Sequence, residues 1–382
     1  MSCLKNCLSP KGENYDCVNA RVRARTRSFL DADAYLRLVR GSLGDMERFL
    51  LQGRASEFFR AQMISGETLL LRRVRAALMS ALSCGLGSVL RMAEGETRDL
   101  LTVLFSGADL DNLRFILRGL LRRSDRENPP LWRGYGILSP LFYDRLWSSC
   151  SSLQEVCELC QENPHPVAGM IASTLAGFLE GAEAAEAVKM TGGDVRQMER
   201  ALLCSFLEYG CAVVRDVSSG NGRALRQYLL LRRDVWNMGV WFRHSGGGDG
   251  DLLRDVEALT APEPETPADP GRTGRTSLKA LNFSAAFLSL WNDLKRDLTR
   301  DGIVPSRGEW HYRLRFGVLE WLRSLYRTNP LGIETLMGYT GMELIEWHNL
   351  NVVASGLAFS MFPERIYCRL IPLGKMRRGN DV

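Results

Sequence analysis

Three segments of the chain place a carboxylate three residues before an asparagine, and they are its clearest candidates for a built polar site. The pattern occurs in DLDNLRFILRG, in DVWNMGVWFR and, with glutamate as the acid, in EWHNLNVVASG. An arginine follows the asparagine by six residues in the first two copies, and Ser355 replaces it in the third. The residues concerned are Asp109, Asn112, Arg118, Asp234, Asn237, Arg243, Glu346 and Asn349.

The spacing of the motif fits a structural role. Residues three apart share a helix face, so the amide can bond the carboxylate or a nearby backbone group. Asparagine is a poor helix former, and its recurrence in apolar helical segments indicates a specific hydrogen bond that fixes how helices cross. We interpret the motifs as polar clamps and expect Asn112 and Asn237 to be buried and hydrogen-bonded. Direct contact with a partner is the alternative; catalysis is not supported, because no second carboxylate, histidine or nucleophile recurs with the motif.

One group of residues has a spacing that could hold a metal. Cys150, Cys157, Cys160 and His165 form a C-x6-C-x2-C-x4-H pattern. In that hypothesis the protein is an enzyme with a Cys/His site and purifies with stoichiometric zinc. Cys157 and Cys160 also fit an apolar helical pattern, however, and packing as small core residues explains them better. We therefore expect no metal site.

Phosphate and nucleic-acid signatures are weak in this sequence. The Gly-rich stretch GGGDGD lacks the lysine of a phosphate-binding loop, and GRTGRTS has the wrong spacing, so no cofactor is expected. Lys+Arg total 49 against 44 Asp+Glu, and both signs are mixed along the chain. The arginines of RVRARTR (residues 21–27) alternate and would spread around a helix, so they form no basic stripe. We predict no nucleic-acid partner.

Hydrophobic periodicity near 3.6 predicts amphipathic helices throughout the 382 residues. No alternating β-branched run bounded by a hairpin turn is present, so we expect an all-α fold without significant sheet. The clearest apolar stripes are Leu110, Leu113, Leu117, Leu120 and Leu121; Leu314, Val318, Trp321, Leu322 and Leu325; and Phe287, Trp291, Leu294 and Leu298.

The motif copies indicate internal repeats. A leucine five residues before a tyrosine also recurs, as Leu30/Tyr35 and Leu138/Tyr143. We predict two good copies and one diverged copy of a helical unit. The expected organisation is a flexible head (1–14), repeat 1 (15–125), repeat 2 (126–244), a polar Gly/Pro-rich linker (245–277), repeat 3 (278–373) and a basic tail (374–382).

The sequence shows neither a secretory signal at its start nor an apolar stretch of membrane-spanning length. The first 15 residues lack the apolar core of a secretory signal, and no apolar stretch reaches the ~20 residues that a membrane-spanning helix needs. We therefore expect a cytosolic location, with the ten cysteines as reduced thiols.

Several segments resemble a known family. The opening YDCVNARVRA (residues 15–24) and FLDADAYLRLV (29–39) are similar to the start of the rotary V/A-type ATPase subunit called C in bacteria and archaea and d in eukaryotes. DLDNLRFILRG (109–119) and PLGIETLMGYTGMELIEWHNLNVVASG (330–356) resemble that family's internal and C-terminal helices. The resemblance covers about residues 15–365.

The resemblance implies a fold and a role. The fold would be a funnel or cup of three pseudo-symmetric helical lobes. The protein would be a non-catalytic central-rotor subunit, one copy per complex, peripheral to the membrane on its cytoplasmic face. It would stand on the proteolipid ring, receive the central-stalk subunits (D and F type) and pass torque between them for proton or sodium transport. Arg377 and Arg378 would then be candidates for contact with anionic headgroups or the stalk foot.

Some features depart from the family pattern, and another function class stays open. The departures are the long polar linker, the cysteine-bearing head and Ser355 in the third motif. The alternative function is a cytosolic helical scaffold or regulator that binds protein or nucleic acid. That reading predicts a basic stripe and stability without a membrane complex.

Overall fold

The computed structural model describes residues 14–65, 69–122, 129–181, 192–217, 220–244, 283–299 and 306–372. Within these ranges the regular structure is helical and includes no strand, which confirms the predicted all-α fold. The helices are α1 (Tyr15–Arg25), α2 (Ala32–Val39), α3 (Leu43–Gln52), α4 (Ser56–Ile64), α5 (Leu70–Met92), α6 (Gly95–Arg122), α7 (Pro140–Ser149), α8 (Leu153–Glu162), α9 (Pro166–Gly181), α10 (Gly192–Arg215), α11 (Asn221–His244), α13 (Ala285–Thr299), α14 (Arg307–Ser324), α15 (Ile333–Ala358) and α16 (Pro363–Tyr367), with short 3₁₀ turns at Thr26–Ser28 and Leu325–Arg327. None of the described helices is long and apolar enough to cross a membrane.

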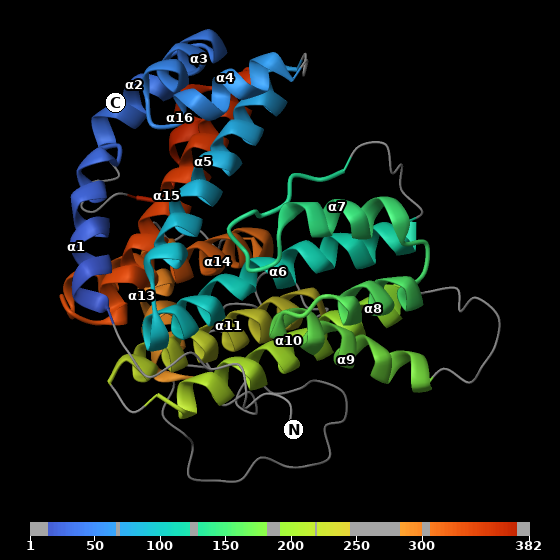
Figure 1. Cartoon of the computed structure of the whole chain (residues 1–382). Helices are drawn as coiled ribbons and strands as arrows, with labels where there is room; N and C mark the ends of the chain where they lie inside the picture. Colours follow the sequence, from blue (N-terminus) through green and yellow to red (C-terminus); the bar gives the residue numbers. More distant parts are fainter. Residues whose placement is uncertain are drawn as a thin grey trace.

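The helices form two connected groups (Figure 1). In the first, α5 and α15 run side by side, α1 lies along them, and α2, α3, α4 and α16 cover one end. In the second, α6 packs on α10, α8 on α9, and α9 on α10, with α7 beside α6. Helices α11, α13 and α14 join the groups, because α11 contacts α10 and α14 contacts α15.

Side-chain caps fix the starts of several helices. Ser42 and Asp45 form a reciprocal capping box at the start of α3. At α7, the Ser139 side chain accepts the Phe142 N–H, and Pro140 occupies the first helical position. These caps define where the connections before α3 and α7 end.

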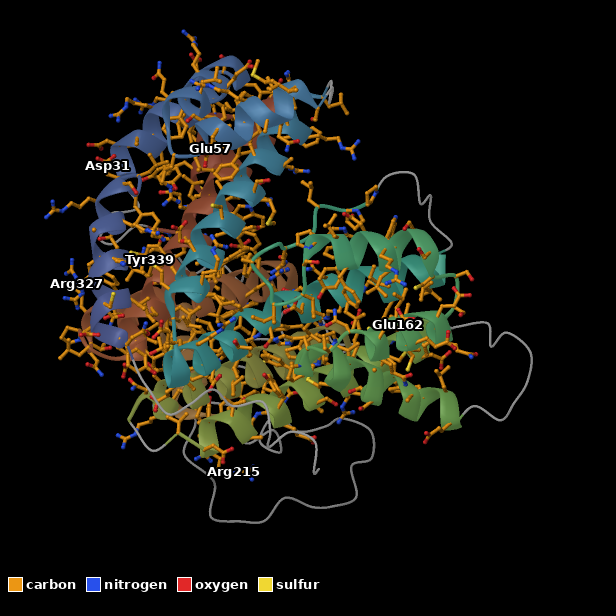
Figure 2. The ribbon with its side chains drawn as sticks, in the orientation of Figure 1. Asp31, Glu57, Glu162, Arg215, Arg327 and Tyr339 are labelled. Carbon is orange, nitrogen blue, oxygen red and sulfur yellow. The ribbon has the colours of Figure 1, made fainter. Side chains whose placement is uncertain are left out.

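Apolar side chains build two cores. The larger core includes stacked rings of Phe287 and Trp291 on α13 and Trp310 on α14, with centroids 6.0 and 4.9 Å apart. The smaller core lies between α2–α5 and α15–α16, where Tyr35 and Phe59 are fully buried. Every residue of the three predicted apolar stripes lies in the larger core or packs against it, which confirms the stripes. Charged groups such as Glu162 and Arg215 lie on the outside (Figure 2).

Helix α15 joins the two ends of the chain. It packs against α1, α2, α3 and α5 from the N-terminal part and against α14 and α16 from the C-terminal part. Two glycines let the chain before it approach closely: a Cβ on Gly338 would lie 2.4 Å from the backbone of Tyr326, and one on Gly341 would lie 2.6 Å from the Arg323 nitrogen. A side chain at either position would push α15 away from the end of α14.

The division into repeats 15–125, 126–244 and 278–373, and the three-lobed funnel built from them, stay predictions. Residues 1–13, the linker 245–277 and the tail 374–382 lie outside the described residues, and so do Arg377 and Arg378.

Candidate functional site

The first motif lies on α6 and is completely buried. Asp109 accepts hydrogen bonds from the Ile137 N–H at 2.8 Å, the Leu138 N–H at 3.0 Å and the Tyr143 hydroxyl at 2.9 Å. A Cβ on Gly136 would lie 2.4 Å from the Asp109 carboxylate, so only glycine fits there without a shift. Burial raises the pKa of Asp109 to about 7, against the three hydrogen bonds that favour the charged form. The aspartate therefore ties α6 to the connection that precedes α7 and to α7 itself.

The asparagines of the first and third motifs each make the same pair of hydrogen bonds. The Asn112 amide donates to the Arg133 carbonyl at 3.2 Å, and its oxygen accepts the Arg133 N–H at 2.9 Å. Asn349 donates to the Ile371 carbonyl at 3.0 Å and accepts the Ile371 N–H at 2.8 Å. Each amide thus satisfies both backbone groups of one residue in a non-helical segment. The clamps hold a helix to a connection, whereas we expected them to fix the crossing of two helices.

The acid of the third motif repeats part of the first. Glu346 accepts the Leu30 N–H at 2.8 Å, as the acid of the first motif accepts that of Leu138. Each leucine lies five residues before a buried tyrosine, Tyr35 or Tyr143. The leucine of the recurrent leucine–tyrosine pair therefore supplies the backbone N–H that binds the acid of the motif.

The second motif is less complete. Asp234 is fully buried and accepts the Ser284 N–H and the Arg233 guanidinium, each at 2.8 Å. Asn237 is only half-buried, so the expectation that it is buried is wrong, and its amide has no hydrogen-bond partner within the described ranges. Ser284, one residue before α13, reaches the acid of this motif but not its amide, so the described chain supplies no counterpart of Arg133 or Ile371.

The arginine position differs among the copies. Arg118 binds both carboxylate oxygens of Glu199, at 2.7 and 3.1 Å, and so joins α6 to α10. Arg243 lies in the last turn of α11, and its side chain lies outside the described residues. In the third copy Ser355 accepts from Arg75 at 2.9 Å and donates to a backbone carbonyl of its own helix.

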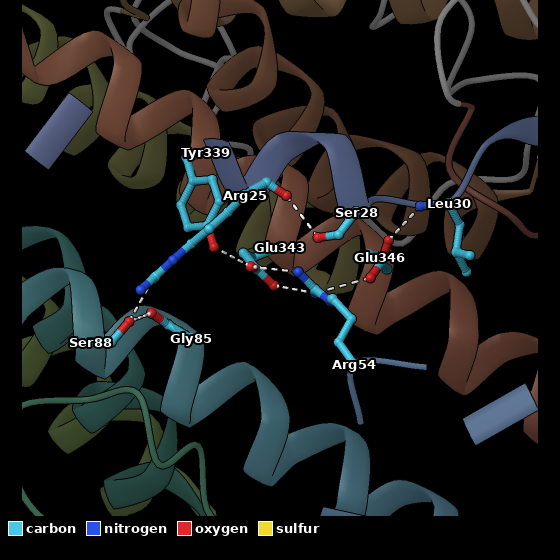
Figure 3. Close-up of polar contacts among 9 residues, drawn as sticks. All are labelled: Arg25, Ser28, Leu30, Arg54, Gly85, Ser88, Tyr339, Glu343 and Glu346. Atoms are coloured by element: carbon cyan, nitrogen blue, oxygen red, sulfur yellow. Dashed lines mark hydrogen bonds and ion pairs between the residues drawn. The ribbon is translucent and has the colours of Figure 1, made fainter. Parts of the chain in front are cut away.

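A buried ion cluster, not anticipated from the sequence, lies next to the third motif (Figure 3). We call Arg54, Tyr339, Glu343 and Glu346 the Arg54 cluster. Arg54, between α3 and α4, binds both oxygens of Glu343 at 3.0 and 2.7 Å and reaches Glu346 at 3.0 Å. The Tyr339 hydroxyl donates to Glu343. The Glu343 and Glu346 side chains are only 3% and 8% exposed, against 35% for Arg54.

Helix geometry explains how α15 presents these groups. Tyr339, Glu343 and Glu346 follow one another at spacings of four and three, so they share the helix face turned toward Arg54. Burial raises the pKa of Glu346 to about 6. The Arg54 charge and the Leu30 N–H oppose this increase, whereas the nearby Glu343 carboxylate adds to it. Burial also raises the pKa of Tyr339. A cavity of about 130 Å³ lies beside the cluster and is lined in part by Arg54, Glu343 and Glu346.

The contacts of the Arg54 cluster fit a structural role. Both carboxylates are engaged by one guanidinium, and within the described ranges neither contacts a cysteine, serine or histidine side chain. Such a cluster fixes the position of α15 against the connection between α3 and α4.

The cysteine and histidine hypothesis receives no geometric support. Across the described ranges no three His, Cys, Asp or Glu side chains lie where they could share a metal ion. Cys157 and Cys160 are buried on α8, and the Cys157 thiol donates to the Ala172 carbonyl at 3.4 Å. His165 accepts the Val167 N–H at the start of α9. These side chains serve packing and helix capping.

Replacing Asn112 with leucine tests the clamp. The Arg133 N–H and carbonyl would lose their partner, and we expect the free energy of unfolding to fall by about 1–3 kcal/mol in urea titrations. Asn237→Leu is the matched control, because the half-buried Asn237 has no described partner, and it should change stability by less than about 0.5 kcal/mol. Equal losses in the two variants would contradict the clamp.

The raised pKa of Glu346 predicts a pH dependence with a definite sign. The folded state favours the protonated form, so the stability from this group is complete below the ordinary value of 4.5 and is lost as pH rises through about 6. We expect this loss to be about 2 kcal/mol. Glu346→Gln should remove it from the urea-unfolding profile between pH 4 and 7, while the slope due to Asp109, whose pKa is also raised, should remain. Glu162→Gln, at an exposed carboxylate, should leave the profile unchanged. Parallel profiles for wild type and Glu346→Gln would contradict the prediction.

Comparison with known proteins shows the family of the chain. A search of curated proteins finds no match. The family model described as ATP synthase (C/AC39) subunit matches residues 18–368, which include all three motifs and the Arg54 cluster. This chain belongs to the ATP synthase (C/AC39) subunit family, whose members are subunits of V/A-type rotary ATPases.

Proposed function

We propose that this protein is a non-catalytic coupling subunit in the rotor of a V/A-type ATPase. It passes rotation between the central stalk and the membrane proteolipid ring, and so links ATP turnover to proton or sodium transport. The observation that carries this proposal is the family match over residues 18–368. One copy would act in each complex.

The packing of α15 supports a mechanical role. A torque coupler needs a body that resists shear, and close-packed helices with low compressibility provide one. Helix α15 contacts helices from both ends of the chain, and the Arg54 cluster and the Asn349 clamp add directional bonds along it. Load applied to either group of helices would therefore reach the other through α15.

The proposed partners follow from the proposed position. The stalk subunits of D and F type would bind one face, and the proteolipid ring would lie at the other, at the cytoplasmic face of the membrane. Arg377 and Arg378 in the tail are proposed to contact anionic headgroups or the stalk foot.

Binding to isolated stalk subunits tests the proposal directly. The purified full chain should co-migrate with the stalk subunits in gel filtration, and it should hydrolyse no ATP in a coupled assay. The catalytic head subunits without the stalk are the matched control and should not retain the chain. Failure to co-migrate with the stalk, or ATP turnover by the purified chain, would contradict the proposed function.

A further inference from the structure

Four arginines from separate parts of the chain converge on a single carboxylate. We call Arg114 on α6, Arg133 before α7, Arg232 on α11 and Arg315 on α14 the central arginine cluster. Arg133 and Arg114 bind the Asp111 carboxylate at 2.6 and 3.2 Å. Burial would raise the pKa of Asp111, yet the four arginines together hold it at about 2.

Among the described residues, the cluster carries more positive charge than the neighbouring carboxylates neutralise. The next carboxylate, Glu199, is held at both oxygens by Arg118, and Arg114 reaches it only at 3.9 Å. Arg232 and Arg315 form no ion pair with any carboxylate of the described chain. Partial desolvation lowers the pKa of Arg315; Asp111 opposes this shift, and Arg133 and Arg232 add to it. Uncompensated charge at a partly buried position is costly unless a partner supplies the missing anion.

Aromatic groups and a glycine hold the buried arginines in place. The Arg114 guanidinium lies over the Trp236 ring, 3.9 Å from its centroid. Arg232 donates to the Tyr228 hydroxyl at 3.3 Å. A Cβ on Gly107 would lie 1.9 Å from the Arg232 guanidinium, so the glycine provides the space that this side chain fills. The positive charges are therefore positioned before any partner arrives, which reduces the entropy lost on binding.

Arg315 is the exposed member of the cluster. On the same stretch of α14, the Phe316 ring lies tilted against the His348 ring of α15, with centroids 4.0 Å apart. The Tyr312 ring meets the Phe316 ring edge to face, with centroids 4.5 Å apart. An exposed arginine beside partly buried aromatic rings has the composition of a protein-binding surface. Guanidinium groups also bind carboxylates in a bidentate manner.

We propose that the central arginine cluster binds the carboxylates of an acidic segment of a partner protein, with Arg315 as the first contact. Because it rests on the proposed function, this inference assigns the segment to the central stalk. The partner's carboxylates would offset the charge that Asp111 and Glu199 leave uncompensated, and the aromatic rings beside Arg315 would pack against its apolar side chains.

A peptide arm tests the chemistry without the stalk. The probe is a fluorescein-labelled twelve-residue peptide of alternating glutamate and leucine, and its binding to the purified full chain is followed by fluorescence anisotropy. We expect Arg315→Glu to weaken binding at least tenfold and added salt to weaken wild-type binding. Arg296→Glu, at an exposed arginine on α13, is the matched control and should bind as wild type does. Equal binding by Arg315→Glu and wild type would overturn the inference.

A stalk arm separates this inference from the proposed function. Arg315→Glu should weaken co-migration with the stalk subunits at least tenfold, and Arg315→Lys should restore part of it because the charge returns without the bidentate geometry. Normal stalk binding by Arg315→Glu would overturn the inference and leave the proposed function intact. Loss of stalk binding by wild type would overturn the proposed function, while the peptide arm would still decide whether the cluster binds carboxylates. If Arg315→Glu unfolds in urea at a lower concentration than wild type, Arg315→Ala replaces it in both arms.

Discussion

Replacing Arg54 with methionine is expected to lower the free energy of unfolding by about 3 kcal/mol at pH 7.5, near the lower end of the range of roughly 3–5 kcal/mol for a broken buried ion pair. The substitution leaves the Glu343 and Glu346 carboxylates without their counter-ion in an environment where they are almost inaccessible to water. Arg54 itself is partly exposed, which is why the lower end applies. Urea unfolding followed by circular dichroism measures the loss.

Two comparisons identify the cause of that loss. Arg48 forms an exposed ion pair with Asp45, so Arg48→Met should cost less than about 1 kcal/mol. Adding Glu343→Gln and Glu346→Gln to Arg54→Met removes the unpaired charges and should recover part of the stability. A triple variant as unstable as the single one would show that Arg54 acts through packing, for instance through its contact with the Phe29 ring, and not through charge.

The helices could be predicted from the sequence because their signal is local. Leu113 and Leu117, four residues apart on α6, are both completely buried, as the period of 3.6 requires. The pairing of Asp109 with Asn112 was visible for the same reason, since both members lie within one helical turn. The backbone that they hold could not be identified, because Leu138 and Arg133 are brought to them by a connection of unpredictable path.

The Arg54 cluster could not be found by local patterns. Arg54 lies 289 residues before Glu343, and no spacing rule joins residues that distant. One signal was present: Glu343 and Glu346 are acidic residues on one face of a mostly apolar helical stretch, where charges are rarely buried without a partner. The central arginine cluster was hidden in the same way, since Arg232 and Arg315 come from separate helices.

The motif of α11 shows that a sequence repeat does not guarantee the same hydrogen bonds in each copy. Asp234 and Asn237 match the first copy in type and spacing, but only the acid is buried and bonded in the described chain. The same residue types at the same spacing place these side chains on the same face of each helix. What packs on that face depends on the segments that follow, and in α6 and α15 those segments supply a residue whose N–H and carbonyl both face the amide.

Removing this subunit from the native ATPase is expected to abolish ion transport while ATP hydrolysis continues. Hydrolysis needs only the catalytic head and stalk to cycle, whereas pumping requires the membrane ring to receive the same torque. In the intact complex, chemical blockade of the ring's ion-binding carboxylate should slow hydrolysis. In the complex without this protein, hydrolysis should become insensitive to the blocker. Ion uptake into vesicles and ATP hydrolysis are measured side by side on both preparations.

Adding the purified full chain back provides the control for damage during its removal. Restored ion uptake, together with restored sensitivity of hydrolysis to the blocker, would show that the missing link is this subunit and not an inactivated ring. Arg54→Met tests the mechanical argument in the same assay: a rotor part whose α15 is held less firmly should restore uptake less completely than wild type, although both bind the stalk. Ion transport at the normal rate without the protein would refute the coupling role, because torque would then reach the ring by a path that does not pass through this chain.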